Sequence, residues 1–168
     1  SIIYGEMKDE DWLNSWKRFF TPIKVGGNIM VAPCWQEDVP KDMTVIRIDP
    51  GMIFGTGSHE TTRLCLEEIE KHMKKGSSFL DLGCGSGILS IGALLLGARQ
   101  ALCVDIEENA REVVKENAEL NGINSGIETL VGDLLEDKEL ISRLLENQYE
   151  FIAANIVAGV IIGILPMV

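Results

Sequence analysis

Short apolar segments and helically spaced apolar positions alternate along the second part of the chain. The segments 79–82, 101–104, 127–131 and 151–154 have the length and apolar character of buried strands. The stretches around them carry apolar residues three or four positions apart, which is typical of helices that pack one face on a sheet. We expect these helices at residues 61–74, 86–96, 108–120 and 138–146. The alternation predicts an α/β, Rossmann-like fold with helices on both faces of a parallel sheet.

The first 50 residues follow a different pattern. Residues 9–20 place two tryptophans on one broad apolar face, as in an amphipathic helix. Gly26-Gly27-Asn28 separates two short apolar segments and indicates a hairpin, and residues 44–48 alternate like a half-buried strand. We therefore expect a helix and small antiparallel strands at residues 1–50, followed by the main domain at residues 51–168.

The uncharged stretch 151–168 is long enough to raise the question of a membrane span. It contains Asn155 and Pro166, lacks a basic flank and begins like a buried parallel strand. We interpret it as a core strand, a loop and the start of a helix.

A glycine turn connects the first of the four predicted strands to its helix. Gly83, Gly85 and Gly87 allow a sharp turn and leave no side chain in the way of a ligand. In a dinucleotide-binding G-x-G-x-x-G loop, a third glycine would stand where this chain has Ile88. Together with Asp81 before the turn, this spacing favours an S-adenosylmethionine site over a dinucleotide site. A structural turn without a ligand is the alternative.

Polar residues follow the other three strands. Asp105, Asp133 and Asn155 stand at or just after the strand ends. Because ligands bind at the carboxyl ends of the strands in open α/β sheets, we expect these residues to share one site with Gly83. An acid about 20 residues after the glycine turn is placed to accept hydrogen bonds from ribose hydroxyls, which makes Asp105 the candidate ribose ligand.

A second glycine-rich stretch, residues 51–62, leads into the helix predicted at 61–74. The backbone N–H groups of such a loop at a helix N-terminus can bind an anion or a carboxylate. A glycine linker capped by Ser58 or Thr61 explains the same residues. The residues alone leave both interpretations open.

Composition and charge narrow the class of protein. With 168 residues, of which 46% are hydrophobic and 24% charged, the chain suits one soluble domain with its own core. The net charge of −11 argues against a broad electrostatic contact with nucleic acid. The N-terminus lacks the pattern of a secretory signal.

The four cysteines predict a cytoplasmic protein without a metal site. Cys34, Cys65, Cys84 and Cys103 lie apart from one another and have no histidines at zinc spacing. Reduced packing residues are therefore the expected role. Cys84 has no base in its local sequence, which argues against a nucleophile.

Four motifs, spread over most of the chain, occur in the combination that is typical of one protein family. They are W-x-x-x-W-K-x-F-F from Trp12, D-P-G-M-x-F-G-T-G-x-H-x-T-T from Asp49, D-x-G-C-G-S-G-I-L from Asp81, and A-N-I from Ala154. In combination they resemble the ribosomal protein L11 methyltransferases (the PrmA family), which are class I S-adenosylmethionine-dependent methyltransferases. The glycine motif indicates only the class, whereas the motifs from Asp49 and Ala154 narrow it to the family.

The resemblance implies S-adenosyl-L-methionine as the cofactor. Gly83 would lie beside its methionine part, Asp105 would hold the ribose, and Asp133 would face the adenine by analogy with the class. The positions that match the family's cofactor contacts, with the neighbouring loop glycine, are Thr62, Gly83, Gly85, Asp105 and Asn155.

The resemblance also implies two catalytic candidates. The side-chain oxygen of Asn155 would orient a neutral amine toward the methyl group. His59 is a candidate general base, with a structural role in the glycine-rich stretch as the alternative. The continuation Asn155-Ile156-Val157 lacks the Asn-Pro-Pro-Tyr pattern of many amino-methyltransferases, which counts against a glutamine or nucleobase enzyme.

The implied activity is methyl transfer to lysine side chains and the N-terminal amine of ribosomal protein L11. Family members carry a further N-terminal domain, for which there is little room before Asp9, and the sheet of the class normally continues beyond a fourth strand. We therefore expect a truncated chain. Two alternatives stay open: a class I methyltransferase for another amine or a small molecule, and an inactive cofactor-binding fragment.

Overall fold

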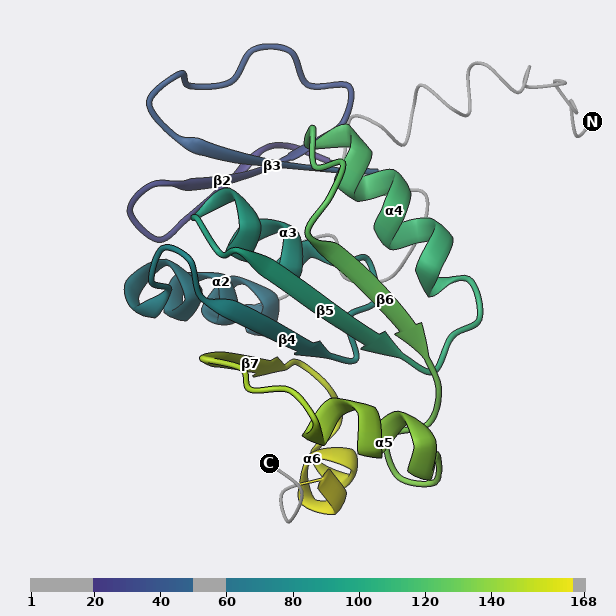
Figure 1. Ribbon diagram of the computed structural model, residues 1–168. Coiled ribbons are helices and arrows are strands. Elements are labelled where there is room, and N and C mark those ends of the chain that lie inside the picture. Colours follow the sequence, from purple (N-terminus) through teal and green to yellow (C-terminus); the bar gives the residue numbers. More distant parts are fainter. Residues whose placement is uncertain (1–19, 50–59, 165–168) are drawn as a thin grey trace, which may run out of the picture.

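A parallel sheet forms the centre of the computed structural model, which describes residues 20–49 and 60–164 (Figure 1). Its strands are β4 (Ser78–Leu82), β5 (Gln100–Asp105), β6 (Ile127–Val131) and β7 (Phe151–Ala154). They lie in the order β6-β5-β4-β7, and every neighbouring pair is parallel. The predicted parallel α/β sheet is confirmed.

The strand register brings the four strand ends to one edge of the sheet. Leu82 lies opposite Val104 on one side and opposite Ala154 on the other. Asp105 lies opposite Val131. The residues that follow each strand therefore lie on the same side of the molecule, as the sequence predicted.

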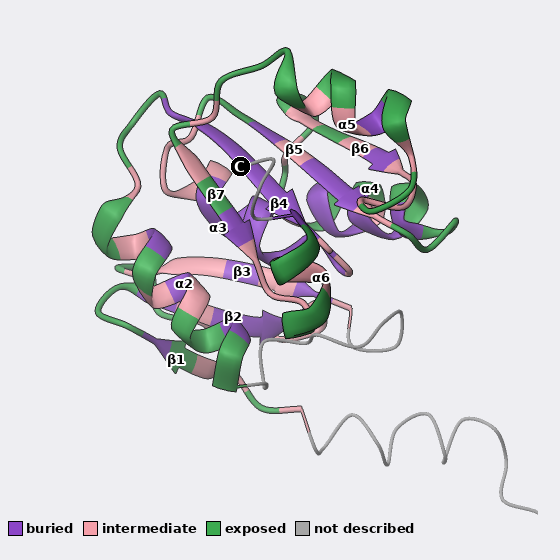
Figure 2. Ribbon diagram, turned by 90° about the horizontal axis from the view of Figure 1, so that it is seen from below, coloured by how far each residue is buried: buried purple, intermediate pink, exposed green. Residues whose placement is uncertain are grey.

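Helices cover both faces of this sheet. One face packs on α2 (Glu60–His72), α3 (Ile88–Leu95) and α4 (Ala110–Leu120), and the other on α5 (Lys138–Leu145) and α6 (Ala158–Ile164). Alternate residues of β4 divide between the two layers: Phe79 packs with α2 and α3, and Leu80 and Leu82 pack with α5 and α6. β4 is buried along its whole length for this reason (Figure 2).

A smaller sheet precedes the main one. β1 (Ile23–Val25) and β2 (Ile29–Pro33) form the predicted antiparallel hairpin. β3 (Thr44–Ile48) pairs parallel to β2, so the prediction of antiparallel strands throughout was wrong for β3. Residues 34–43 form a connection long enough to return the chain to the start of β2, which a tight turn would not do (Figure 1).

The small sheet shares a hydrophobic core with the helices of the main domain. Val25, Ile29 and Ile46 are completely buried in the same cluster as Leu66 of α2 and Ile91 of α3. The helix layer is thus sandwiched between the two sheets. The division of the chain at residue 50 stays a prediction.

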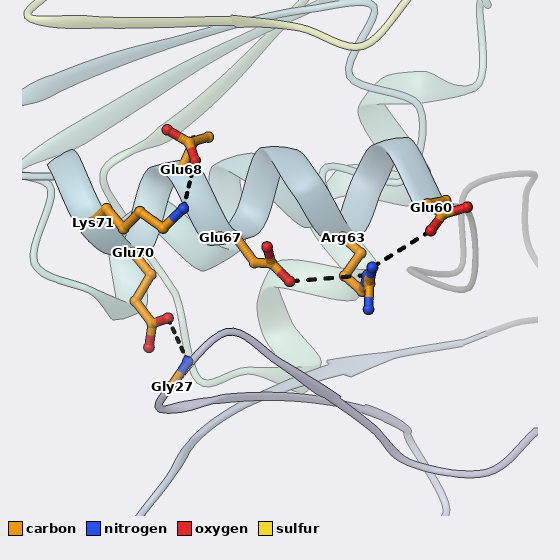
Figure 3. A network of polar contacts seen from close by, with 7 residues as sticks. All are labelled: Gly27, Glu60, Arg63, Glu67, Glu68, Glu70 and Lys71. Carbon is orange, nitrogen blue, oxygen red and sulfur yellow. Dashed lines mark hydrogen bonds and ion pairs between the residues drawn. The ribbon is translucent and has the colours of Figure 1, made fainter.

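The β1–β2 turn is also fixed by a carboxylate. Glu70 of α2 accepts a hydrogen bond from the backbone N–H of Gly27 at 2.8 Å (Figure 3). It accepts a second one from the backbone N–H of Asn28 at 2.6 Å. The ion pairs along the same helix, such as Lys71 with Glu68 at 2.7 Å, are exposed and contribute little to stability.

Of the segment 151–168, predicted as a core strand, a loop and the start of a helix, residues 151–164 are described and form a strand, a loop and a helix, with the strand at the edge of the described sheet. β7 is the edge strand of the described sheet, and Ile152 on it is 39% exposed. Val157 and Ile162 are 72% and 68% exposed, and much of α6 is coloured as exposed in Figure 2. Within residues 20–49 and 60–164, no helix is both long enough and apolar enough to cross a bilayer.

Candidate active site

The glycine loop, residues 83–87, has a backbone conformation that requires glycine. Gly83, Gly85 and Gly87 have φ angles of 72°, 51° and 75°, in the left-handed region that side chains rarely adopt. The N–H groups of Gly83 and Cys84 both donate to the carbonyl of Val104, at 2.8 Å and 3.0 Å. The turn between β4 and α3 is therefore fixed to the neighbouring strand.

The asparagine loop, residues 155–157, lies directly over Gly83. A Cβ atom on Gly83 would be 2.0 Å from Cγ2 of Ile156, a distance that no side chain tolerates. The first glycine of the glycine loop is thus required by close approach as well as by backbone conformation. The two loops meet at this contact.

Asp105 lies at the end of β5, with both carboxylate oxygens beside the glycine loop. Oδ2 accepts a hydrogen bond from the N–H of Gly85 at 2.7 Å, and Oδ1 accepts one from the N–H of Glu107 at 3.1 Å. A carboxylate offers about four lone-pair sites, so each oxygen can accept one more hydrogen bond. Asp105 is therefore oriented by backbone donors and still able to bind hydroxyl groups.

Asp81 is a fully buried carboxyl group beneath the glycine loop. Its Oδ2 accepts from the N–H of Ser90 at 3.2 Å and from the Ser90 hydroxyl at 2.8 Å, and its Oδ1 has no hydrogen-bond partner among the described residues. Burial raises the pKa of Asp81 to about 7, against the hydrogen bonds from Ser90, which lower it. The sequence placed Asp81 in a predicted buried strand before the loop, and its burial agrees with that prediction.

The thiol of Cys84 is a packing group. Cys84 and Cys103 are buried together against Val114 of α4. The hydrogen bond to Cys103 and burial both raise the pKa of the Cys84 thiol, so it holds its proton at neutral pH. This agrees with the interpretation of Cys84 as a structural residue.

A contact distant in sequence connects the asparagine loop to α2. Nδ2 of Asn155 donates a hydrogen bond to Oγ1 of Thr62 at 3.1 Å, and Thr62 is 2% exposed. Because the amide nitrogen is oriented toward Thr62, the amide oxygen is the acceptor that Asn155 can offer to another molecule. The structure thus brings together two residues that the sequence proposed for one site.

Asp133 follows β6, and its backbone stands beside the end of β5. The N–H of Gly132 donates to the carbonyl of Asp105 at 2.9 Å, and Oδ1 of Asp133 accepts from the N–H of Leu135 at 2.7 Å. The side chain is half-buried. The location at the carboxyl edge of the sheet is confirmed, and the contact with adenine stays a prediction.

Some predicted features lie outside the described residues. These are His59, most of the glycine-rich stretch before α2, and the amphipathic helix with Trp12 and Trp16. The two interpretations of the glycine-rich stretch stay open. The role of His59 stays a prediction.

The sequence analysis missed a buried polar residue, Asn117. It is 0% exposed on α4, and its Nδ2 donates to the carbonyl of Ser86 at 3.0 Å. The apolar face of α4 includes Val113, Val114 and Ala118, and position 117 falls on that face. A polar residue at a buried helical position was the signal that could have revealed it.

The parallel sheet, with a glycine loop of spacing G-x-G-x-G after an inner strand and an acid at the end of the next strand, is the fold of the class I methyltransferases. A solved S-adenosylmethionine-dependent methyltransferase from Agrobacterium tumefaciens shares this fold with a TM-score of 0.51 and 21% identity, over 60% of this chain and 33% of that one. A second, from Thiobacillus denitrificans, has a TM-score of 0.50 and 17% identity, over 62% of this chain and 42% of that one.

The comparison with protein families narrows the assignment from the class to one family. The model of the family "Ribosomal protein L11 methyltransferase (PrmA)" matches residues 2–168, and the chain belongs to this family. The ribosomal protein L11 methyltransferase of Lachnoclostridium phytofermentans is 42% identical over 98% of this chain and 54% of its own length. That of Caldanaerobacter subterraneus is 44% identical over 96% of this chain and 50% of its own length.

A solved member of the family supports the same assignment. The structure of ribosomal protein L11 methylase from Lactobacillus delbrueckii has a TM-score of 0.76 and 36% identity, over 88% of this chain and 72% of that one. This chain spans about half the length of the curated relatives that it matches.

Proposed function

We propose that this chain is the cofactor-binding part of a methyltransferase that transfers methyl groups from S-adenosyl-L-methionine to amines of ribosomal protein L11. The family match over residues 2–168 carries the proposal. The relatives that it matches are named for this substrate. We place the activity in the cytoplasm because the named substrate is a ribosomal protein, and assign residues 51–168 to the methyltransferase domain.

The residues at the carboxyl edge of the sheet fit an adenosine cofactor without phosphates. The glycine loop carries no side chain at Gly83, Gly85 or Gly87, and Asp105 retains acceptor sites on both oxygens. We assign the methionine part to the glycine loop and the ribose to Asp105. Asp133 is the proposed neighbour of the adenine.

The cofactor supplies an activated methyl group on its sulfonium, so the chain needs to align and desolvate the amine rather than activate a leaving group. We assign the alignment to Asn155, whose oxygen can accept an N–H bond from a neutral amine while Thr62 holds its nitrogen at 3.1 Å. Ile156 over Gly83 would exclude water from the same space. His59 is proposed as the general base.

Titration calorimetry tests the cofactor. We expect the chain to bind S-adenosylhomocysteine and not NAD. Asp105→Ala should weaken binding by about 1–3 kcal/mol, because hydrogen bonds to a charged acceptor are lost. Glu107→Ala is the matched control, since only the backbone N–H of Glu107 contacts Asp105. Binding of NAD without binding of S-adenosylhomocysteine would overturn the proposal.

Transfer of a labelled methyl group tests the substrate. We expect label in L11 and none in free RNA, in the longest form of the protein that contains this chain. Label in RNA would contradict the assignment of L11 as the substrate. Label only in a small amine would favour a class I methyltransferase that acts on another amine or a small molecule.

Because the chain spans half the length of its relatives, a cofactor-binding fragment is the other candidate. Cofactor binding without transfer to any amine would identify it.

A further inference from the structure

Helix α4 carries two asparagines, four residues apart, on the face that it turns toward β3. Asn117 is completely buried, and Asn121 is the C-cap residue of the helix. Residues four apart lie on the same face of a helix, so both amides point in one direction. Each contacts the backbone of β3 or the residue that follows it.

These contacts complete the edge of β3 that does not pair with β2. Asn121 accepts from the N–H of Arg47 at 2.8 Å and donates to the carbonyl of Arg47 at 2.6 Å. Asn117 accepts from the N–H of Asp49 at 3.2 Å. Residues two apart present their backbone groups on the same edge of a strand, so the two amides take the place of a neighbouring strand.

Asn117 differs from Asn121 because its other end reaches the glycine loop. Its Nδ2 donates to the carbonyl of Ser86 at 3.0 Å, between Gly85 and Gly87. The amide orientation is unambiguous, since one end meets a backbone donor and the other a backbone acceptor. Asn121 makes no recorded contact with this loop.

A second contact from α4 supports the loop at the next residue. A Cβ atom on Gly87 would lie 3.0 Å from Cγ1 of Val114, which stands one helical turn before Asn117. The glycine loop therefore rests on α4 at two successive positions, one apolar and one polar. The loop carries the Gly85 N–H that binds Asp105.

We propose that Asn117 is a positioning residue, which holds the glycine loop in its cofactor-binding conformation and couples it to the end of β3 at Asp49. One amide thus connects the loop assigned to the cofactor with the end of β3. The inference rests on the proposed function, because it assumes that the glycine loop binds S-adenosylmethionine.

Asn117→Leu and Asn121→Leu form a matched pair for testing this role. Both remove an amide that completes the edge of β3, and both should lower the unfolding midpoint. Only Asn117→Leu removes the contact with the glycine loop. At a temperature where both variants are folded, we expect Asn117→Leu to bind S-adenosylhomocysteine about tenfold more weakly than wild type, from one lost hydrogen bond and a loosened loop, and Asn121→Leu to stay within about twofold.

Amide hydrogen exchange gives a second, ligand-free measurement. In Asn117→Leu, the N–H groups of Gly85 and Gly87 should exchange faster while those of β5 keep their protection. Asn117→Ala, which removes the same amide and adds no bulk, is the second variant if leucine prevents folding. It leaves the Ser86 carbonyl without this donor and should shift loop exchange in the same direction.

The outcomes separate the two proposals. Failure of wild type to bind S-adenosylhomocysteine would overturn the proposed function, and loop exchange would still test Asn117. Equal effects of the Asn117 and Asn121 variants on affinity and on loop exchange would overturn the positioning role. It would equally be overturned by unchanged loop exchange in both Asn117 variants.

Discussion

The glycine loop and the asparagine loop meet at one contact and are held in different ways. The glycine loop donates backbone N–H bonds to Val104 and Asp105 of the next strand, and Asp105 is 20 residues from Gly85. The asparagine loop is held by Thr62, 93 residues from Asn155, and by packing of Ile156 on Gly83. The half of the site assigned to the cofactor is therefore tied mainly to the next strand and helix, and the half assigned to the amine depends on contacts much farther apart in the chain.

The two loops also differ in how deeply their residues are buried. Cys84 in the glycine loop is 6% exposed, whereas Val157 in the asparagine loop is 72% exposed. β4 is a central strand and β7 is at the edge of the described sheet, which explains the difference. The following substitutions test this difference between a buried glycine loop and a less buried asparagine loop.

The largest effect is expected from Gly83→Ala, at the contact between the loops. The new Cβ would overlap Ile156 at a φ of 72°, so we expect a loss of about 3–4 kcal/mol in the free energy of unfolding and no measurable cofactor binding. Urea unfolding and calorimetry measure both. Gly122→Ala is the control: its φ is 71° with nothing within 4 Å, so only the backbone strain of about 1–2 kcal/mol applies.

Ile156→Ala in the Gly83→Ala background refines this test. Truncation of Ile156 should restore part of the lost stability, because the overlapping atom is removed. Equal losses in the Gly83 and Gly122 variants would show that the loops do not touch.

Asp81→Asn should change how stability depends on pH, through the support beneath the glycine loop. The pKa of Asp81 is raised from 3.8 to about 7 in the folded chain, so the folded state binds more protons than the unfolded state between these values. Stability therefore falls as pH rises from about 4 to about 7, by at most about 1.4 kcal/mol per pH unit from this group. Melting temperatures across this range should fall less steeply in Asp81→Asn than in wild type.

Asp42→Asn is the control for the pH experiment, because Asp42 is exposed. Its slope should match that of wild type. A wild-type slope in Asp81→Asn would contradict the assignment.

Thr62→Val removes the hydrogen bond that orients the asparagine loop. The shape is kept and the acceptor for Asn155 is lost, so we expect about 1 kcal/mol lower stability and about tenfold slower methyl transfer. Initial rates and urea unfolding measure these effects. Thr61→Val, at an exposed neighbouring position, should change neither, and transfer at the wild-type rate in Thr62→Val would remove this contact from the site.

The smallest effect is expected far from both loops. Glu70→Gln weakens the two bonds to the β1–β2 turn and should cost about 0.5–1 kcal/mol with unchanged affinity for S-adenosylhomocysteine. Glu67→Gln weakens the partly exposed pair with Arg63 at 3.9 Å and should be nearly neutral. A change in cofactor affinity in Glu70→Gln would show that the small sheet influences the site.

The sequence predicted most of the fold because apolar periodicity is local. The strands 127–131 and 151–154 have the predicted bounds, and the glycine loop has the positive φ angles that its spacing required. The direction of β3 was predicted wrongly, since an alternating strand pattern is the same for parallel and antiparallel pairing.

The sequence predicted which residues lie at the site but not which residues they contact. Ligands bind at the carboxyl ends of parallel strands, and this rule depends only on strand direction and order. It therefore placed the four residues at one edge of the sheet: Gly83, Asp105, Asp133 and Asn155. The close contact of Ile156 with Gly83 joins segments far apart in the chain, and no local sequence pattern predicts such a contact. Asn117 was visible as a polar residue on an apolar helix face, but its partners Ser86 and Asp49 were not.

The buried thiol of Cys84 allows the opening of the glycine loop to be measured through its rate of alkylation. An alkylating reagent reaches this thiol only from conformations in which the loop has separated from Cys103 and α4, because the folded loop buries it and raises its pKa. The alkylation rate therefore measures the free energy of loop opening, and a ligand that binds the closed loop slows it according to its occupancy. Cys34 and Cys65 are only partly buried and give the faster background reaction.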